Sequence, residues 1–274
     1  MTEAAHKINF ANALMELRAP VEALSLLPAL PILRRLAPRG NGQPVLILPG
    51  FLATDNSTYV LRRYLKRQGY NAHGWDLGRN AGLRNSTYLK LEQRIIEMYG
   101  QHQEKISLIG WSLGGLYARI LAHRLPDYVR QVITLGSPFN LAQPKATSDV
   151  DEVSSSILKI YERLNPGASQ DELLQGTPIW EMPPPVPSTS IYSESDGIAA
   201  WRSCIDETSA STENLRISGS HIGMTHNPMI YYAVSDRLAQ TEEQWKPFDA
   251  HWAHRYLFLR ASDGKPESVH EAHA

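Results

Sequence analysis

The spacing of apolar and polar positions predicts short strands that alternate with longer helices along most of this chain. Six short segments are interpreted as strands, and they lie at residues 45–48, 70–75, 106–109, 132–135, 189–192 and 214–217. Between them, residues 57–68, 86–99 and 113–125 carry apolar side chains at helical spacing. A last helix is predicted to start at Asn227-Pro228, where a good N-cap precedes a good first helical residue. This α/β order predicts a mostly parallel sheet with helices on both faces.

Three segments lie outside this alternation. Residues 140–187 are polar, hold one amphipathic stretch and end in three prolines, and we interpret them as an inserted cap. The tail from residue 262 is polar, and we expect it to be frayed. We therefore divide the chain into an N-terminal helical extension (1–42), an α/β domain (43–261, with the cap at about 140–187) and a flexible tail (262–274).

The least polar stretch of the chain is residues 21–36. Pro28 and Pro31 interrupt it, so we expect that it does not form one long regular helix. We expect it to pack against the main domain; the alternative is peripheral contact with a membrane, with Arg34 and Arg35 at its edge. No apolar run reaches the ~18 residues of a spanning helix, and the first residues do not resemble a signal peptide. A cytoplasmic, soluble protein is therefore expected.

Composition excludes several classes of function. Apolar residues make up 42% of the chain and charged residues 20%, as in globular proteins. The net charge of −1 argues against a nucleic-acid partner, because phosphate binding needs a cationic excess. Cys204 is the only cysteine, so a disulfide within the chain and a cysteine-based zinc site are excluded. The histidines are not paired with carboxylates at ligand spacing, so we expect no metal.

The strongest chemical signal follows the strand at 106–109. Residues 110–114 read Gly-Trp-Ser-Leu-Gly, which is G-x-S-x-G between a predicted strand and a predicted helix. A sharp turn at this place needs glycine on either side of the serine, because larger side chains would collide. The turn lifts the Ser112 hydroxyl above the sheet and places it at a helix N-terminus. Ser112 is thus the candidate nucleophile, and an idle serine in a glycine-rich turn is the alternative.

A serine hydroxyl needs a base to act as a nucleophile. His221 follows the strand at 214–217 in a loop of small residues, and it is our candidate. His226 is the nearest rival but lies beside the next helix cap. Of the others, His73 is interpreted as structural, and His251 and His254 are placed on a surface of the C-terminal segment.

The base in turn needs a carboxylate that holds its tautomer. Asp196 follows the strand at 189–192 and precedes Gly197, which allows the chain to turn away. Glu194 is a near alternative and Asp206 a distant one, while Asp76 is interpreted as a loop-forming carboxylate. The resulting chain order of serine, aspartate and histidine is that of the α/β hydrolases.

A developing oxyanion needs two hydrogen-bond donors. The amide of Leu113, directly after the candidate nucleophile, is the first candidate. The second is the amide of Phe51, in the loop after the strand at 45–48, where Gly50 allows a close backbone approach.

On these residues the chain resembles the α/β-hydrolase family, and within it the bacterial lipases and esterases, over about residues 43–240. The resemblance rests on the Pro-Gly-Phe loop at 49–51, the elbow at 110–114, Asp196 and His221, with support from residues 134–138. The chain departs from such lipases at Pro49 and Phe139, where they often carry histidine. The resemblance implies a reduced sheet of about six strands.

The resemblance also implies an activity. It is that of a carboxylesterase or lipase that cleaves acyl esters, lipid-like or with short-to-medium chains, through an acyl-enzyme on Ser112 and without metal or organic cofactor. The insert either roofs the substrate pocket or decorates the surface; the candidate lining residues are Leu52, Phe139, Leu141, Ile157 and Tyr161. The alternatives are an acyltransferase with the same triad and a non-catalytic, membrane-docked binding protein. A haloalkane dehalogenase is disfavoured, because it would carry a carboxylate at the position of Ser112.

Overall fold

The computed structural model describes residues 14–140, 159–167, 170–175, 178–242, 244–249 and 259–260. Within these residues seven strands form one sheet in the order β2-β1-β3-β4-β5-β6-β7. The first six in that order pair in parallel, and β7 pairs antiparallel with β6. The strands are β1 (Pro44–Leu48), β2 (Asn71–Gly74), β3 (Ile106–Trp111), β4 (Val129–Leu135), β5 (Ser188–Ser193), β6 (Thr212–Ile217) and β7 (Leu259–Arg260). The prediction of a mostly parallel sheet is confirmed.

The strand order contains a switch point between β1 and β3. From β1 the chain first pairs β2 on one side, and then returns to add β3 on the other side. Parallel sheets open a crevice at such a point, beyond the carboxyl ends of the strands. The loop after β1 and the turn after β3 therefore meet at this crevice.

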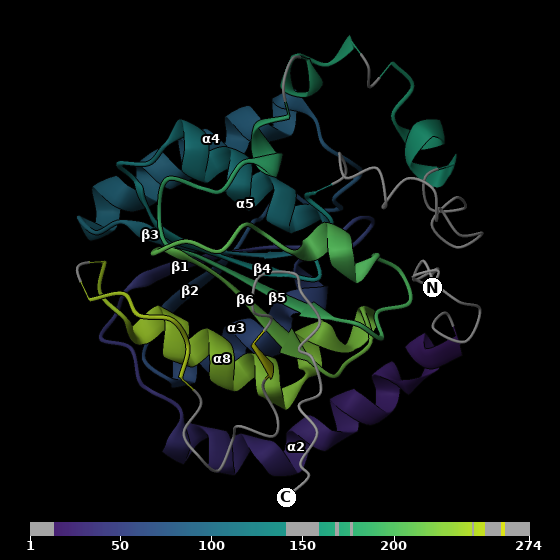
Figure 1. Ribbon diagram of the computed structural model, residues 1–274. Coiled ribbons are helices and arrows are strands. Elements are labelled where there is room, and N and C mark those ends of the chain that lie inside the picture. Colours follow the sequence, from purple (N-terminus) through teal and green to yellow (C-terminus); the bar gives the residue numbers. More distant parts are fainter. Residues whose placement is uncertain are drawn as a thin grey trace, which may run out of the picture.

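Helices cover both faces of the sheet (Figure 1). Successive residues of β1 point to opposite faces, so that Val45 and Ile47 join one core while Leu46 and Leu48 join the other. The helices α4 and α5 cover one face, and α3, α8 and α2 cover the other. The helices are α2 (Ala19–Leu36), α3 (Tyr59–Arg67), α4 (Asn85–His102), α5 (Leu113–Arg124) and α8 (Pro228–Ala239).

The ends of the predicted helices shift by a few residues. The segment predicted at 57–68 opens with a 3₁₀ turn, η2 (Asp55–Thr58), before α3 begins. The helix α4 continues through Gly100 to His102, and the next residue, Gln103, reverses the chain with a φ of 54°. The predicted start of α8 is confirmed, because the Asn227 side chain accepts a hydrogen bond from the Met229 amide at 2.9 Å.

The expectation that prolines break the stretch 21–36 is wrong. The helix α2 runs through 18 residues with Pro28 and Pro31 inside it. Both prolines lie on the exposed side, where water can hydrate the carbonyls that they leave without a donor. On the opposite side Leu26 and Leu33 are buried in the same core as α8, and this packing holds the helix together. Among the described residues no helix combines the length and the apolarity needed to cross a membrane.

The described part of the insert is attached to the loop that precedes α4. The Asn165 side chain donates to the Ala81 carbonyl at 2.7 Å, and Arg84 donates to the Asn165 side chain at 2.8 Å. The Asp171 carboxylate accepts from the Asn85 amide at the start of α4. Two 3₁₀ turns follow, η4 (Glu172–Leu174) and η5 (Ile179–Glu181). The division into three segments stays a prediction.

The packing of α2 is testable by two leucines that lie two positions apart. Leu26→Ala is expected to lower the free energy of unfolding by about 2–5 kcal/mol, because it leaves a cavity where a side chain is now only 2% exposed. Leu24→Ala removes a side chain that is 64% exposed and is expected to change the same quantity by less than about 0.5 kcal/mol. Guanidinium unfolding curves measure both. Equal losses for the two variants would contradict the orientation of α2.

Candidate active site

The turn between β3 and α5 holds Ser112 in a strained backbone conformation. Its φ is 53° and its ψ is −124°, a region that side chains rarely adopt. The Ser112 amide donates to the Leu135 carbonyl at 2.8 Å, which ties the turn to β4. Glycine is required around the turn because a Cβ atom would clash with neighbouring backbone. A Cβ at Gly110 would lie 2.3 Å from the Gly115 Cα, and one at Gly114 would lie 2.3 Å from the Leu48 carbonyl oxygen. The glycine pattern in the sequence is therefore a packing requirement.

The loop after β1 passes directly beside this turn. A Cβ at Gly50 would lie 3.1 Å from the Ser112 Cβ, so the two backbones approach as the sequence predicts. Asn80 holds this loop in place through hydrogen bonds. It exchanges backbone hydrogen bonds with Leu52 and Ala53, and its side chain donates to the Pro49 carbonyl at 2.8 Å. Asn80 is buried, and no local pattern in the sequence marks it as a support of this loop.

Both candidate oxyanion donors lie where these two segments meet. Phe51 follows Gly50 in the β1 loop, and Leu113 is the first residue of α5. Among the described residues, neither amide has a hydrogen-bond acceptor. Two unpaired N–H groups at adjoining segments, one of them at a helix N-terminus, suit the binding of a negatively charged oxygen.

His221 and Asp196 form a buried pair at the ends of β6 and β5. The distance between His221 Nδ1 and Asp196 Oδ2 is 2.7 Å, and both side chains are almost fully buried. The other oxygen of Asp196 accepts hydrogen bonds from the Ile198 and Ala199 amides at 2.8 and 2.7 Å. An ionised carboxylate only accepts hydrogen bonds, so this pairing holds the proton on Nδ1 and leaves Nε2 as the acceptor of the neutral imidazole.

Opposing influences set the pKa of His221. Burial is the largest of them and lowers the pKa. The negative charge of Asp196, its hydrogen bond to the imidazole and the charge of Glu16 all raise it, and together they outweigh burial. The pKa of His221 is therefore raised above its ordinary value of 6.5. The imidazole is thus a stronger base than free histidine.

Trp111 joins the serine turn to the histidine loop. Its indole Nε1 donates to the His221 carbonyl at 3.1 Å, and its ring centre lies 5.9 Å from that of the imidazole. Because Trp111 directly precedes Ser112, the structure brings Ser112, His221 and Asp196 to one edge of the sheet.

The rival carboxylates have other partners. Glu194 pairs with Arg216 at 2.7 Å, and Asp76 pairs with Arg94 at 2.5 Å. Asp206 is buried against the guanidinium of Arg119 at 2.5 Å. Their positions favour Asp196 as the partner of His221.

His226 and His73 have other contacts. Burial lowers the pKa of His226, whose Nδ1 is 3.1 Å from the Thr225 hydroxyl. His73 lies in β2, with its ring 5.8 Å from that of His102. His251 and His254 lie outside the described residues.

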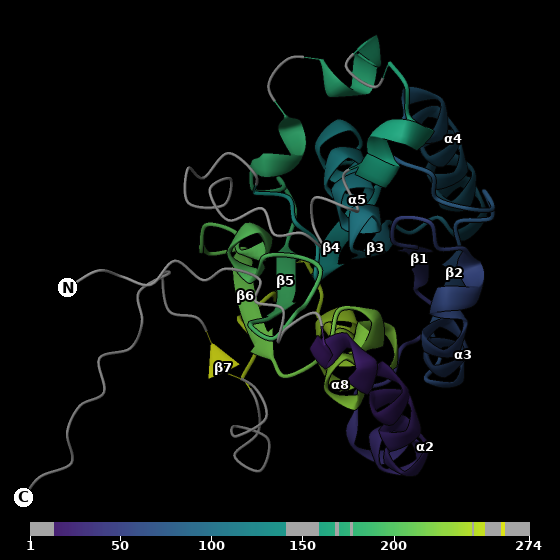
Figure 2. The same ribbon diagram turned by 90° about the vertical axis from the view of Figure 1, so that its right-hand side faces the viewer.

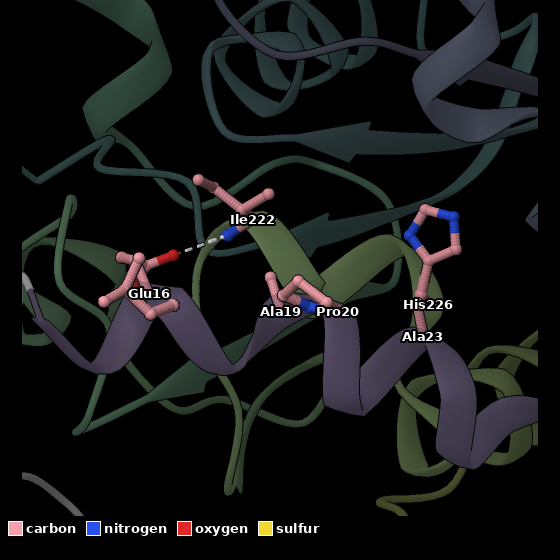
Figure 3. A pocket seen from close by; sticks show the side chains of 7 residues that line it. Glu16, Ala19, Pro20, Ala23, Ile222 and His226 are labelled. Carbon is pink, nitrogen blue, oxygen red and sulfur yellow. Dashed lines mark hydrogen bonds between the residues drawn. The ribbon is translucent and has the colours of Figure 1, made fainter.

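The N-terminal segment supports both loops of this pair, which the sequence analysis did not predict. Glu16 lies in η1 (Glu16–Arg18), the 3₁₀ turn before α2. Its Oε1 accepts from the Gly197 and His221 amides, both at 2.8 Å. Its Oε2 accepts from the Ile222 amide at 2.9 Å, the contact that Figure 3 draws as a dashed line. One carboxylate thus joins the loop after β5 to the loop after β6. We call these contacts the Glu16 bridge.

Two further side chains of the same segment strengthen the attachment. Glu22 accepts from the Ser220 amide and from the Ser220 hydroxyl, each at 2.8 Å. A Cβ at Gly223 would lie 1.7 Å from Glu22, so only glycine allows this approach. Arg18 pairs with Glu22 and donates to the Ser195 hydroxyl at 2.6 Å. In the sequence, the only signal was the polar residues Glu16, Arg18 and Glu22 at one end of an otherwise apolar stretch.

A shallow pocket of about 430 Å³ lies between this segment and the turn η7 (Ile222–His226) (Figure 3). Glu16 and His226 supply its polar groups, and its other lining residues are Leu17, Ala19, Pro20, Ala23 and Ile222. Ser112 does not line it, so this pocket lies on the outer side of the histidine loop, apart from the candidate nucleophile.

The candidate substrate-lining residues lie in different surroundings. Leu52 is partly exposed on the β1 loop, and the ring of Tyr161 lies 5.5 Å from that of Phe51. Phe139 requires a correction. It is fully buried in the core, where the guanidinium of Arg119 stacks over its ring at 3.7 Å, so it does not line an open pocket. Leu141 and Ile157 lie outside the described residues. In the described part of the chain no three His, Cys, Asp or Glu side chains gather as metal ligands.

Comparisons with known proteins show which known folds this chain resembles. Residues 81–181 match a family described as a PGAP1-like alpha/beta domain, a span that contains Ser112 but not Asp196 or His221. A search of curated proteins gives no match. The structure is similar to the crystal structure of Aspergillus fumigatus lipase B, with a TM-score of 0.50, 18% identity and coverage of 73% of this chain.

A second solved structure is similar to the same degree. It is the mature form of the Bacillus licheniformis lipase BlEst2, with a TM-score of 0.51 and 15% identity. The likeness covers 75% of this chain and 95% of the Bacillus enzyme. In contrast, it covers only 53% of the Aspergillus enzyme, so this chain spans about half of that protein.

The Glu16 bridge leads to a prediction about the pKa of His221. Glu16→Gln removes a negative charge that stabilises protonated His221, so the pKa of His221 is expected to fall. NMR titration of the imidazole signals measures it. Glu194→Gln is the matched control, because Glu194 pairs with Arg216 and does not bind the histidine loop. An unchanged or raised pKa in Glu16→Gln would contradict the electrostatic role of the bridge.

Proposed function

Since this chain has the fold of the α/β hydrolases, we propose that it hydrolyses carboxylic esters through an acyl-enzyme on Ser112. The observation that carries the proposal is the buried pair of His221 and Asp196 beside the strained turn of Ser112. A histidine whose Nδ1 is held by a carboxylate has its Nε2 free to take a proton, as general-base catalysis requires.

The proposed reaction begins with attack of Ser112 Oγ on the ester carbonyl carbon. His221 Nε2 takes the serine proton as the new C–O bond forms, and Asp196 stabilises the imidazolium. When the tetrahedral intermediate collapses, the C–O bond to the alcohol breaks and His221 gives its proton to that oxygen. Water then attacks the acyl-enzyme with the same base, which releases the acid and restores Ser112.

The two amides that have no acceptor among the described residues are the proposed donors to the negative charge that develops on the carbonyl oxygen. In the proposal the N–H groups of Phe51 and Leu113 donate to this oxyanion, and the N-terminus of α5 adds a partial positive charge. The hydrogen bonds of Asn80 support the β1 loop, so the Phe51 donor is fixed before the substrate arrives. Donors fixed in advance lower the reorganisation that the reaction needs.

The proposed substrate is an ester with an apolar acyl part, lipid-like or of short-to-medium length. Leu52 on the β1 loop is 37% exposed, and Tyr161 of the insert packs against its neighbour Phe51. These side chains offer apolar surface beside Ser112. The Tyr161 hydroxyl accepts from the Leu83 amide at 3.3 Å, which ties this part of the insert to the loop before α4.

Ser112→Ala tests the proposed nucleophile. Hydrolysis of nitrophenyl esters from C2 to C16 is expected to fall at least about 10³-fold, and fluorophosphonate is expected to label wild-type Ser112 but not the variant. Ser86→Ala, at an exposed position of α4, is the matched control and should keep both activity and labelling. Full activity in Ser112→Ala, or a label on another residue, would refute the assignment.

The pH dependence tests the proposed base. His221 must be neutral to accept a proton, so kcat/KM is expected to fall as the pH drops through the pKa of His221. Because this pKa is raised, the midpoint of the fall should lie above 6.5. His226→Gln should leave that midpoint in place, since His226 does not touch the pair. A profile that stays flat down to about pH 4 would exclude His221 as the base.

A further inference from the structure

The helix α2 has two unlike faces. Leu26 and Leu33 face the core and are 2% and 8% exposed. On the other side five large apolar side chains are turned to solvent. We call this side, together with Leu17 of the preceding turn η1, the outer face of α2; its residues and their exposed fractions are Leu17 75%, Val21 66%, Leu24 64%, Leu27 64% and Ile32 59%. An apolar stripe of this size on the outside of a protein marks a contact surface.

In the described part of the chain no element covers the outer face, so a large, flat partner can reach it. Figures 1 and 2 both show α2 as the outermost helix on its side of the sheet, with α8 between it and the strands. An 18-residue helix is about 27 Å long at 1.5 Å per residue, so the outer face is a long strip and not a spot.

The charges on this helix are arranged for an anionic partner. From residue 14 to residue 36 the only carboxylates are Glu16 and Glu22, and both are turned inward to the loops of His221 and Asp196. The exposed charges are cationic and lie in the last turn, at Arg34 and Arg35. The surface is therefore apolar along most of its length and positive at one end.

The prolines favour a hydrated partner over a dry one. Pro28 and Pro31 are exposed on this side and cannot donate to the carbonyls of Leu24 and Leu27. A dry protein interface would bury these carbonyls without donors, at a cost in free energy. The headgroup layer of a bilayer contains water that can donate to them, while its acyl chains accept the leucine side chains.

We propose that the outer face of α2 docks the protein on an anionic lipid bilayer. The helix lies in the plane of the interface, with its apolar side chains among the acyl chains and the two arginines at lipid phosphates. Through the Glu16 bridge the first turn of this segment touches the His221 loop, so docking brings the candidate active site to the lipid surface. Docking itself does not depend on the proposed hydrolysis.

The experiment measures binding of the full chain to sedimented vesicles. Ser112→Ala is used as the background so that no lipid is hydrolysed, and binding is therefore read independently of the proposed activity. The vesicles contain phosphatidylcholine alone, or phosphatidylcholine with 30% phosphatidylglycerol. Leu24→Gln/Leu27→Gln removes two apolar side chains of the outer face, and Arg34→Gln/Arg35→Gln removes the two charges. Leu89→Gln, at a leucine of α4 that is 51% exposed, is the matched control.

The expected result is binding to the anionic vesicles that weakens with salt. Affinity should fall at least about tenfold in the leucine variant and about fivefold for each arginine removed, while Leu89→Gln should bind like the parent. Circular dichroism and thermal unfolding confirm that the variants are folded.

Three outcomes would overturn the proposal. The first is no binding to either kind of vesicle. The second is binding that survives the leucine and arginine substitutions, which would place the contact elsewhere. The third is a dimer in sedimentation velocity that dissociates in Leu24→Gln/Leu27→Gln, which would make a second copy of the chain the occupant of the outer face.

Discussion

The structure depends on one steric constraint, the turn that places Ser112 at φ 53° between β3 and α5. Such backbone strain costs about 1–3 kcal/mol and persists only where the surroundings hold it. Here the Leu135 carbonyl binds the Ser112 amide, the Leu48 carbonyl lies where a Cβ on Gly114 would stand, and Ser112 itself lies against Gly50 of the β1 loop. The same turn aims the N-terminus of α5 at the crevice between β1 and β3. The glycine spacing and the position of the candidate nucleophile are therefore consequences of one close approach of backbones.

The two sides of the N-terminal segment, η1 and α2, make different contacts. Its inward carboxylates, Glu16 and Glu22, hold the loops of Asp196 and His221 by backbone amides, and the charge of Glu16 helps to raise the pKa of the imidazole. Its inward leucines join the core beside α8, while its outward leucines contact nothing among the described residues that would bury them. The segment is thus neither an appendage nor a simple packing helix, since it is part of the support of the candidate site.

Much of this was visible in the sequence, because the signals are local. A serine between glycines after a strand, and an acid and a histidine each directly after a strand, place the candidate triad without any distant information. The long helix α2 was missed because proline argues against helix at short range, while the opposing packing of Leu26 and Leu33 is tertiary. Phe139 was misplaced for the same reason, since its partner Arg119 is 20 positions away. The Glu16 bridge had no local signal, because its partners lie 181 and 205 residues along the chain.

That separation has a consequence for how the molecule acquires its site. Loop closure grows more costly in entropy with the number of residues enclosed, so contacts across about 200 residues form after the local ones are in place. During synthesis Glu16 cannot bind the amides at residues 197, 221 and 222 until the chain has been made through residue 222. A growing chain can hold its serine turn long before it can support the histidine beside it.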